Sequence, residues 1–484
     1  MFGRAAGGGL LEGAAGGGGE RLVGRRAGRQ VGLGHDGLPS TVDAKKLALA
    51  VASGHGGRVT QELNDGLPAR EGALALIDAA LSRRGGLDEA ASANAFRFLE
   101  PRERAFARAL AMAALRHLGP IDRALAGKLA KEPPPRVRNL LRLGATQAFF
   151  LEVPAFAAVA TSVELAGANK ASRPFKGLVN AVLRGLLRDG APSAEPEHLA
   201  PPWLYARWVG AWGKETADAI AAQIGFEPAT DLSLKPGADA AALVAELEGE
   251  ILPGGTLRTA RRGDVSTWPA FDDGTWWVQD AAAAIPARLL DVRPGQSALD
   301  LCAAPGGKTL QLAAAGAATV AVDRSAARLQ RVTENLARLH LTAEVIAADA
   351  GAWDDGRTFD AVLLDAPCSA TGTFRRHPDV LWAARPGDVA SLAAVQGRLL
   401  DSAAGRLKPG GRLVYCVCSL EPEEGEAQVE AFLARCPDIA LDPIAPEEGG
   451  APAASLTPRG TLRILPHHRE GGLDGFFAAR FVKR

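Results

Sequence analysis

Short apolar runs recur through the C-terminal half of the chain, and each one stops at a polar residue. The runs begin near residues 298, 319, 344 and 360, and each has the length and composition of a buried strand. A helical pattern separates the first run from the second, as in an open α/β sheet. The polar residues that close the four runs are Cys302, Asp323, Asp349 and Asp365. We expect them along one edge of the sheet, which is where such sheets bind ligands.

The first of these runs leads into a turn of small residues, with the sequence CAAPGGK from Cys302 to Lys308. Glycine lets a backbone approach a ligand closely, and the helix predicted over 309–315 offers free N–H groups at its N-terminus. Asp323 follows at close to the ~20-residue offset at which a carboxylate grips a ribose. The turn matches neither GxGxxG nor GxxxxGK[ST], so we expect S-adenosylmethionine as cofactor.

The N-terminal part has a different pattern. Residues 1–66 include a Gly-rich stretch with scattered Arg, for which we predict disorder. Helical periodicity extends over about 69–188, as in the apolar positions of 70–81. Residues 69–190 hold 19 Lys and Arg against 11 Asp and Glu, a surplus that suits phosphate binding, although a solvated surface has the same composition.

Two further segments precede the sheet. Residues 192–202 are predicted to be a linker, and the tryptophans at 208 and 212 are spaced for one helix face packed into a core. Residues 224–268 alternate turn signals with short apolar runs, which indicates a small α+β subdomain. Asp280 is a candidate N-cap for a helix that ends near Leu290.

Composition excludes several classes of protein. The 55 Lys and Arg balance the 55 Asp and Glu, so any basic binding surface must be local. Five cysteines, an odd count without a signal peptide, indicate reduced thiols in the cytoplasm. No apolar run approaches the ~18 residues of a membrane span. The sequence shows no long apolar helix that would need to be buried against another subunit, so a monomer is expected.

Two predicted strands deliver a cysteine to the ligand edge. Asp365–Thr373 reads DAPCSATGT and Gly410–Ser419 reads GGRLVYCVCS, which places Cys368 and Cys418 there. A buried cysteine is most often a small hydrophobe, and we assign that role to Cys416 and Cys436. A zinc site would need more ligands than these segments offer, so no metal is expected.

Two thiols beside a methyl donor suit chemistry at carbon 5 of cytosine, which is a weak nucleophile. A thiolate added at carbon 6 activates carbon 5 for in-line methyl transfer, and a second group can assist release. Asp365 can hydrogen-bond the ring N3 and the amino group of the base. The base must first leave its stack.

The motifs CAAPGGKT, DAPCSATG and CSLEPEE together resemble the RNA cytosine-5 methyltransferases of the Nol1/Nop2/Sun type, and the segments 138–152, 154–164 and 175–187 resemble the RNA-binding NusB family. The resemblance implies a multidomain chain with a NusB-like helical bundle at 67–192, a linker and small α+β subdomain at 193–277, and a Rossmann-like methyltransferase sheet at 278–484. It implies small-subunit ribosomal RNA as partner.

The resemblance also implies site roles. Cys418 would be the nucleophile and Cys368 would assist product release. The cofactor would be held by three acids and the turn, namely Asp323, Asp349, Asp365, Cys302, Ala303, Ala304, Pro305, Gly306, Gly307 and Lys308. Two departures from the family pattern are Val417, where Thr is usual, and Ala350–Gly351, where Gly-Arg is common.

Several alternatives remain open. The chain could be a non-catalytic ribosome-assembly or antitermination factor, although that reading predicts loss of the cysteines or the glycine turn. Cys368 could be the nucleophile, as in DNA cytosine methyltransferases, and an amino-nitrogen methyltransferase is a third reading. Arg375 and Arg376 could clamp RNA phosphate or form a solvated loop pair. Asn180 and Arg184 could contact RNA or pair with each other along a helix.

Overall fold

The computed structural model describes residues 66–82, 87, 96 and 98–484. All of them belong to one compact unit, Thr60–Arg484. The disordered extension predicted for residues 1–66 lies outside the described residues, except for Gly66.

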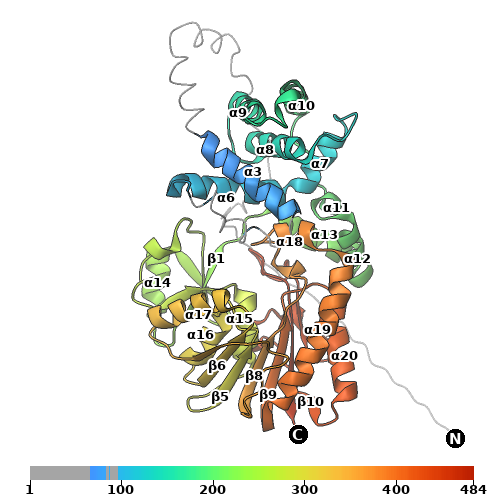
Figure 1. Ribbon diagram of the computed structural model, residues 1–484. Helices are drawn as coiled ribbons and strands as arrows, with labels where there is room; N and C mark the ends of the chain where they lie inside the picture. The colour runs from blue at the N-terminus through green and yellow to red at the C-terminus, as the bar shows by residue number, and fades with distance from the viewer. Residues whose placement is uncertain (1–65, 83–86, 88–95, 97) are drawn as a thin grey trace, which may run out of the picture. The chain divides into compact units, whose positions relative to one another are not determined.

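The N-terminal part is a helical bundle, as its periodicity predicts (Figure 1). Pro101 and Pro135 stand in the first turns of two helices, where a missing N–H costs nothing. Small and branched apolar side chains such as Leu74, Ile77 and Leu110 fill the core. The six helices described here are α3 (Leu67–Ser82), α6 (Pro101–Arg116), α7 (Leu118–Ala126), α8 (Pro135–Phe150), α9 (Ala155–Ala168) and α10 (Lys176–Asp189).

The segment predicted as a linker is more ordered than its Pro/Glu/Ala composition indicates. It forms the short helix α11 (Pro196–Leu199), and Leu199 is buried in a cluster with Trp208. That cluster also includes α12 (Pro202–Trp212) and α13 (Lys214–Ala222). The prediction of a core-packed helix face is confirmed for Trp208, while Trp212 is only partly buried.

The predicted small α+β subdomain is present as a four-stranded antiparallel sheet with one helix. The strand order is β2-β3-β1-β4. Its elements are β1 (Thr230–Leu234), α14 (Ala240–Leu247), β2 (Gly249–Leu252), β3 (Thr256–Thr259) and β4 (Trp276–Val278).

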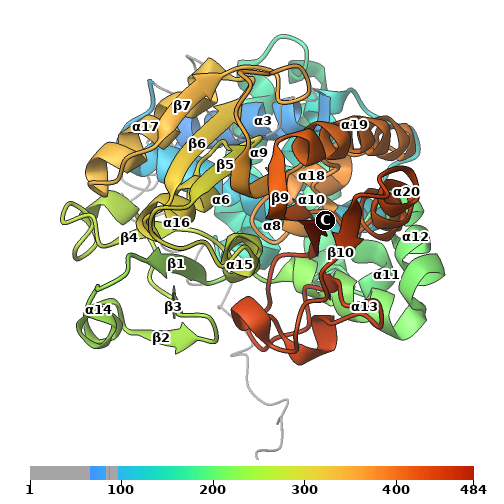
Figure 2. The ribbon, with the colours of Figure 1, turned by 90° about the horizontal axis from the view of Figure 1, so that it is seen from below.

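The C-terminal part is an eight-stranded mixed sheet with helices on both faces (Figure 2). The order is β10-β12-β9-β8-β5-β6-β7, with β11 paired to β12. Strands β5 to β9 are parallel, β12 runs antiparallel to β9, and β10 pairs antiparallel with β12. The strands are β5 (Ser297–Leu301), β6 (Ala318–Asp323), β7 (Glu344–Ala347), β8 (Phe359–Asp365), β9 (Leu407–Val417), β10 (Ile439–Leu441), β11 (Leu462–Ile464) and β12 (Phe476–Lys483).

The helices divide between the two faces of this sheet. One face carries α15 (Ala281–Leu289), α16 (Gly307–Ala314) and α17 (Ala326–Arg338), and the other carries α19 (Pro386–Gly405) and α20 (Glu426–Arg435). Asp280 caps α15 through the N–H of Ala282, as predicted. The fold prediction is confirmed, and the parallel strands bring the four polar strand ends to one edge.

Candidate active site

The turn after β5 is built for close backbone approach. Gly306 has a φ of 109°, in the left-handed region that favours glycine, and it is the N-cap of α16. A Cβ on Gly306 would meet the Val332 side chain at 3.0 Å. The N–H of Ala303 donates to the carbonyl of Val322 at 3.1 Å, and the N–H of Ala304 donates to the Asp323 carboxylate at 3.1 Å. The turn is therefore fixed against the end of β6.

Negative charge converges on this turn. The pKa of Cys302 is raised to about 12, first by burial and then by the charges of Asp365, Asp323, Asp300 and Asp349 in that order. Asp300 in β5 is fully buried, and its pKa is raised to about 7 by that burial. Asp349 is exposed and Asp323 is buried, yet both act on the same thiol. The edge thus offers an acidic setting that suits a cationic ligand.

Lys308 provides a local counter-charge. Its ammonium group donates to the Asp365 carboxylate at 2.8 Å and lies over the Phe476 ring at 5.2 Å. Burial lowers the pKa of Lys308, but the charges of Asp365, Cys416 and Cys418 oppose it and raise the pKa overall. Lys308 therefore stays protonated beside the two strands that carry the cysteines.

The two cysteine motifs meet at the same edge. The Sγ atoms of Cys368 and Cys418 lie 3.5 Å apart, and both side chains are partly buried. The pKa of Cys368 is raised by its hydrogen bond with Cys418, by burial, and by the charges of Cys418 and Glu424. These contacts favour the thiol form of Cys368.

Backbone contacts fix the two loops together. The N–H of Gly372 donates to the carbonyl of Cys418 at 3.0 Å, and the N–H of Leu420 donates to the Thr371 hydroxyl at 3.0 Å. A Cβ on Gly372 would come within 2.0 Å of the Gly475 carbonyl oxygen, so only glycine permits this approach.

The remaining cysteines behave differently. Cys416 is fully buried and donates to Asp365 at 3.4 Å, whereas Cys436 lies after α20 beside Asp401. Val417 is buried in the core opposite Phe477. The Val417 side chain, where the family usually has Thr, therefore packs in the core on the sheet face opposite to its chain neighbours Cys416 and Cys418.

Both alternatives for the arginine pair are wrong. The Arg375 side chain is 2% exposed and donates to the carbonyl of Gly471 at 2.6 Å. Arg376 is largely buried and forms ion pairs with Asp280 at 2.8 Å, Asp231 at 3.3 Å and Asp474 at 3.5 Å. The pair is neither a phosphate clamp nor a solvated loop; it is part of the interior.

The pair Asn180–Arg184 is internal to α10. The Arg184 Nε donates to the side-chain amide oxygen of Asn180 at 3.1 Å in an exposed position. The guanidinium group is accessible while it makes this contact.

Residue types alone did not indicate two structural supports. Arg116 in the helical bundle donates to the carbonyl of Arg375 at 2.7 Å and to that of Phe226 at 2.9 Å. Glu424 is fully buried between the cysteine loops. The CSLEPEE motif contains this glutamate, but nothing in the motif separates it from Glu421 and Glu423.

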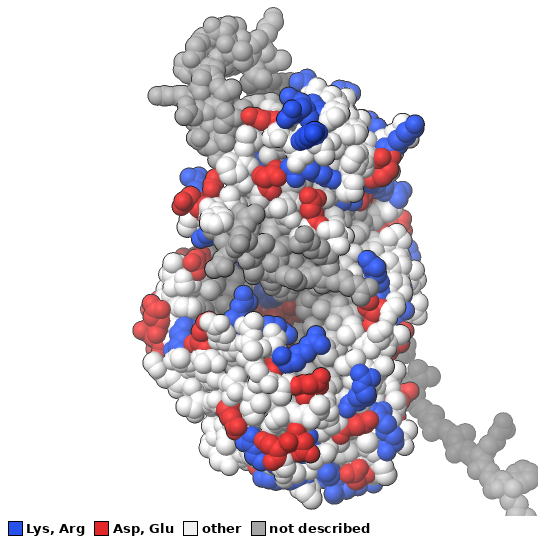
Figure 3. All heavy atoms as spheres, in the orientation of Figure 1, with Lys and Arg blue, Asp and Glu red and all other residues white. Residues whose placement is uncertain are grey.

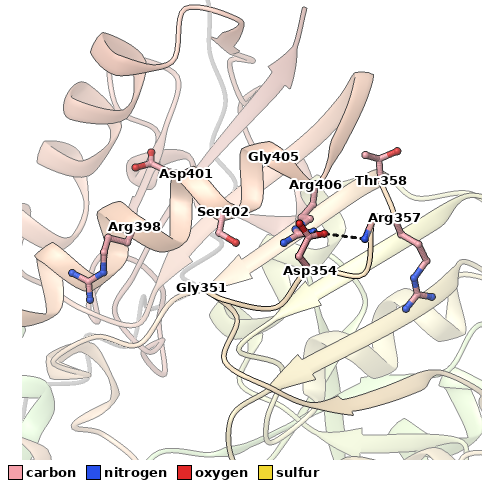
Figure 4. Close-up of a pocket in the computed structure, with 10 residues that line it drawn as sticks. Gly351, Asp354, Arg357, Thr358, Arg398, Asp401, Ser402, Gly405 and Arg406 are labelled. Carbon is pink, nitrogen blue, oxygen red and sulfur yellow. Dashed lines mark hydrogen bonds and ion pairs between the residues drawn. The ribbon is translucent and has the colours of Figure 1, made fainter.

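A hollow of about 660 Å³ lies away from this site (Figure 4). It is formed by the loop before β8 and by the end of α19, where Arg406 pairs with Asp354. None of the sequence-predicted site residues lines it.

The described part of the chain lacks two kinds of feature. Within it, no group of three or more His, Cys, Asp or Glu side chains is placed to hold a metal ion. None of its helices has the length and apolar character needed to cross a membrane.

Comparison with known proteins agrees with this geometry. Residues 287–482 match the model of the 16S rRNA methyltransferase RsmB/F family, and residues 67–188 match the NusB family. Ribosomal RNA small subunit methyltransferase B of Pseudomonas syringae pv. tomato is 40% identical over 392 residues, which cover 74% of this chain and 85% of the relative. The Pseudomonas putida protein of the same name is 37% identical over 86% of this chain and 98% of the relative. The crystal structure of PH0851 superposes with a TM-score of 0.69 at 25% identity, covering 86% of this chain and 99% of that one.

Fold and site together define an S-adenosylmethionine-dependent methyltransferase that carries a NusB-type helical domain. Within that class, the chain belongs to the family of the ribosomal RNA small subunit methyltransferases B.

The residues at the sheet edge fit this cofactor. S-adenosylmethionine carries a sulfonium and an ammonium group, and the carboxylates that raise the pKa of Cys302 supply opposite charge. One of the Asp300 carboxylate oxygens is buried without a hydrogen-bond partner among the described residues. The N-terminus of α16 leaves backbone N–H groups for polar ligand atoms.

Proposed function

We propose that this protein transfers the methyl group of S-adenosylmethionine to carbon 5 of a cytosine in small-subunit ribosomal RNA. The observation that carries the proposal is the 3.5 Å approach of the Cys368 and Cys418 sulfurs at the cofactor edge of the sheet. Nitrogen methylation needs no thiol, whereas carbon 5 needs a nucleophile at carbon 6 and help with release.

In this proposal Cys418 attacks as a thiolate. Its electron pair forms the S–C6 bond, and the C5=C6 pair moves to carbon 5, which takes the methyl group. Lys308 and Asp365, joined at 2.8 Å, face the base and steady the charge that develops on its N3 side. The C5–H bond then breaks, its electron pair restores the C5=C6 bond, and the S–C6 bond breaks to return its electron pair to Cys418. Cys368 assists this release by giving its thiol hydrogen to the departing Cys418 sulfur and taking up the carbon 5 proton in exchange.

Cofactor binding is assigned to the turn Cys302–Lys308 together with Asp323, Asp349 and Asp365. The bound cofactor supplies the methyl group on its sulfonium sulfur. Asp323 orients the turn through the N–H of Ala304 and keeps lone pairs for a ribose.

The helical bundle is the proposed RNA-binding part. Lys and Arg gather around α10 in the upper part of Figure 3. Lys176, Arg184 and Arg188 belong to α10, and Arg184 is exposed. Phosphate contacts of this kind hold an RNA in register without reading its sequence.

We further propose domain boundaries near residues 192 and 277, and a monomer that acts in the cytoplasm, where ribosomes assemble. The alternative hypothesis, an RNA-binding factor without catalytic activity, does not explain why two cysteines pair beside an acidic cofactor-binding edge.

The test is the chemical identity of the product. Small-subunit rRNA transcribed in vitro is incubated with the protein and isotopically labelled S-adenosylmethionine, and the nucleosides are separated by mass spectrometry. We expect 5-methylcytidine. A label on N4 of cytidine, or on another base, would refute the carbon 5 assignment, and absence of label on both naked RNA and assembling particles would favour the binding factor.

A further inference from the structure

Glu424 is a buried carboxylate to which the mechanism above gives no role. It lies at the end of the short 3-10 turn Pro422–Glu424 and has no exposed surface. Its oxygens accept from the Ser369 N–H at 2.9 Å and from the Gln396 side chain at 3.0 Å. They also accept from the hydroxyls of Ser369 and Ser419.

These donors come from both cysteine loops. Ser369 directly follows Cys368, and Ser419 directly follows Cys418. One carboxylate therefore spans the two loops whose sulfurs lie 3.5 Å apart. Gln396 extends the connection to α19, because its Nε2 also donates to the carbonyl of Pro367 at 2.9 Å.

Every donor described on this carboxylate is uncharged. A buried anion held by neutral donors costs several kcal/mol more to desolvate than a neutral amide of the same shape. The four contacts alone do not require a charge, since a glutamine could keep them, with its carbonyl oxygen accepting from the two amide groups and its NH2 group donating to the two hydroxyl oxygens. Because the contacts do not need the negative charge of Glu424, we expect that charge to act on a neighbouring ionisable group.

The neighbour is Cys368. Two ionisable groups near the loops, Cys418 and Glu424, raise the pKa of Cys368. A third group, Tyr415, donates its hydroxyl to the backbone carbonyl of Glu424 at 2.6 Å. Glu421 is paired with Arg207, and Arg463 donates to the carbonyl of Ser419. Negative charge beside Cys368 disfavours a thiolate there.

We propose that Glu424 is a positioning residue, which fixes the two loops in register and keeps the proton of the thiol pair on Cys368 while Cys418 attacks. The proposal rests on the cytosine-5 mechanism given above. Proton and charge balance within the pair, because one sulfur keeps its hydrogen and the other carries the electron pair that bonds to carbon 6.

The test measures the two thiols separately. Wild type, Glu424→Gln and the control Glu423→Gln are alkylated with iodoacetamide between pH 6 and pH 10, and mass spectrometry of the peptides gives a rate for Cys368 and for Cys418. Glu423 suits the control because it is on the same turn, is half exposed and pairs with Arg207.

In wild type and in the control, Cys418 should react faster and at lower pH than Cys368. In Glu424→Gln the Cys368 profile should move to lower pH and the rate ratio should narrow at least threefold. A loss of packing alone would lower the melting temperature and expose both thiols equally. Identical ratios in all three proteins would overturn the proposal.

A second variant, Ser419→Ala, and a second measurement, the rate of adduct formation, test the same proposal independently. Ser419→Ala removes one donor and leaves the charge, so it should slow adduct formation on 5-fluorocytosine RNA while the Cys368 profile stays near that of wild type. If Glu424→Gln does not fold, Ser419→Ala is used in its place. Adduct formation at the wild-type rate in Ser419→Ala would then refute the proposal that Glu424 fixes the two loops in register. Failure of wild type to form any adduct would instead refute the cytosine-5 mechanism itself.

Discussion

The Sγ atoms of Cys368 and Cys418 lie 3.5 Å apart although 50 residues separate them in the chain. The cause is the strand pairing, since β8 and β9 are parallel neighbours and Asp365 stands opposite Cys416. Each strand then releases its loop at the same edge. The sheet, rather than either loop alone, thus sets the distance between the two thiols.

Asp365→Asn should disable the site without unfolding the protein. It removes the negative partner of the Lys308 ammonium group, which is 2.8 Å away, and the group assigned to the base. We expect kcat to fall about 100- to 1000-fold, measured with saturating cofactor and RNA.

The matched control is Asp360→Asn on the same strand. Asp360 lies at the opposite end of β8 and pairs with Lys408 and Ser297. It should retain kcat, so an equal loss of activity in both variants would contradict the role given to Asp365.

Arg376→Gln should destabilise the fold rather than weaken RNA binding. It leaves Asp231, Asp280 and Asp474 buried without this shared cation. Breaking such a buried network costs about 3 to 5 kcal/mol, which urea unfolding measures.

The comparison for this variant is Arg184→Gln on α10. Arg184 is exposed, so its loss should leave stability nearly unchanged and reduce the slope of log Kd for RNA against log salt by about one. If Arg376→Gln kept wild-type stability and changed the slope of log Kd against log salt instead, the result would support a phosphate-binding role for Arg376.

Asp300 should make the cofactor-free protein less stable as pH rises. Burial raises its pKa to about 7 in the folded state, against about 3.9 for an unfolded aspartate. The contribution is therefore fully present below pH ~4 and is lost as pH rises through about 7. Thermal unfolding from pH 4 to 9 should show a decline of roughly 1 to 4 kcal/mol in wild type that Asp300→Asn lacks. Parallel curves for the two proteins would contradict this assignment.

Much of the fold could be predicted because strand ends and helix periods are local signals. The runs that close at Asp323 and Asp365 are strands β6 and β8, which end at the predicted residues and begin one residue earlier, and Asp280 caps α15 as expected. The linker at 192–202 was predicted too loosely, because its composition does not reveal that Leu199 would find a core contact with Trp208.

The sequence indicates the reactive groups proposed for the site but not the residues that support them. Glycine turns and cysteines carry chemistry that few other residues supply, so their types identify them. Arg375, Arg376 and Glu424 look like ordinary surface residues in the sequence, and only long-range packing buries them. Their burial depends on residues distant in the chain, such as Asp474 and Gln396, which no local pattern connects.

The central claim is that Cys418 is the nucleophile and Cys368 is not. RNA with 5-fluorocytosine at the target position is incubated with S-adenosylmethionine and with wild type, Cys418→Ala or Cys368→Ala, and the adduct is resolved on a denaturing gel. Fluorine blocks loss of the group at carbon 5, so an attacking thiol stays bonded. Wild type and Cys368→Ala should give the adduct and Cys418→Ala should give none. An adduct that survives in Cys418→Ala and disappears in Cys368→Ala would contradict the account.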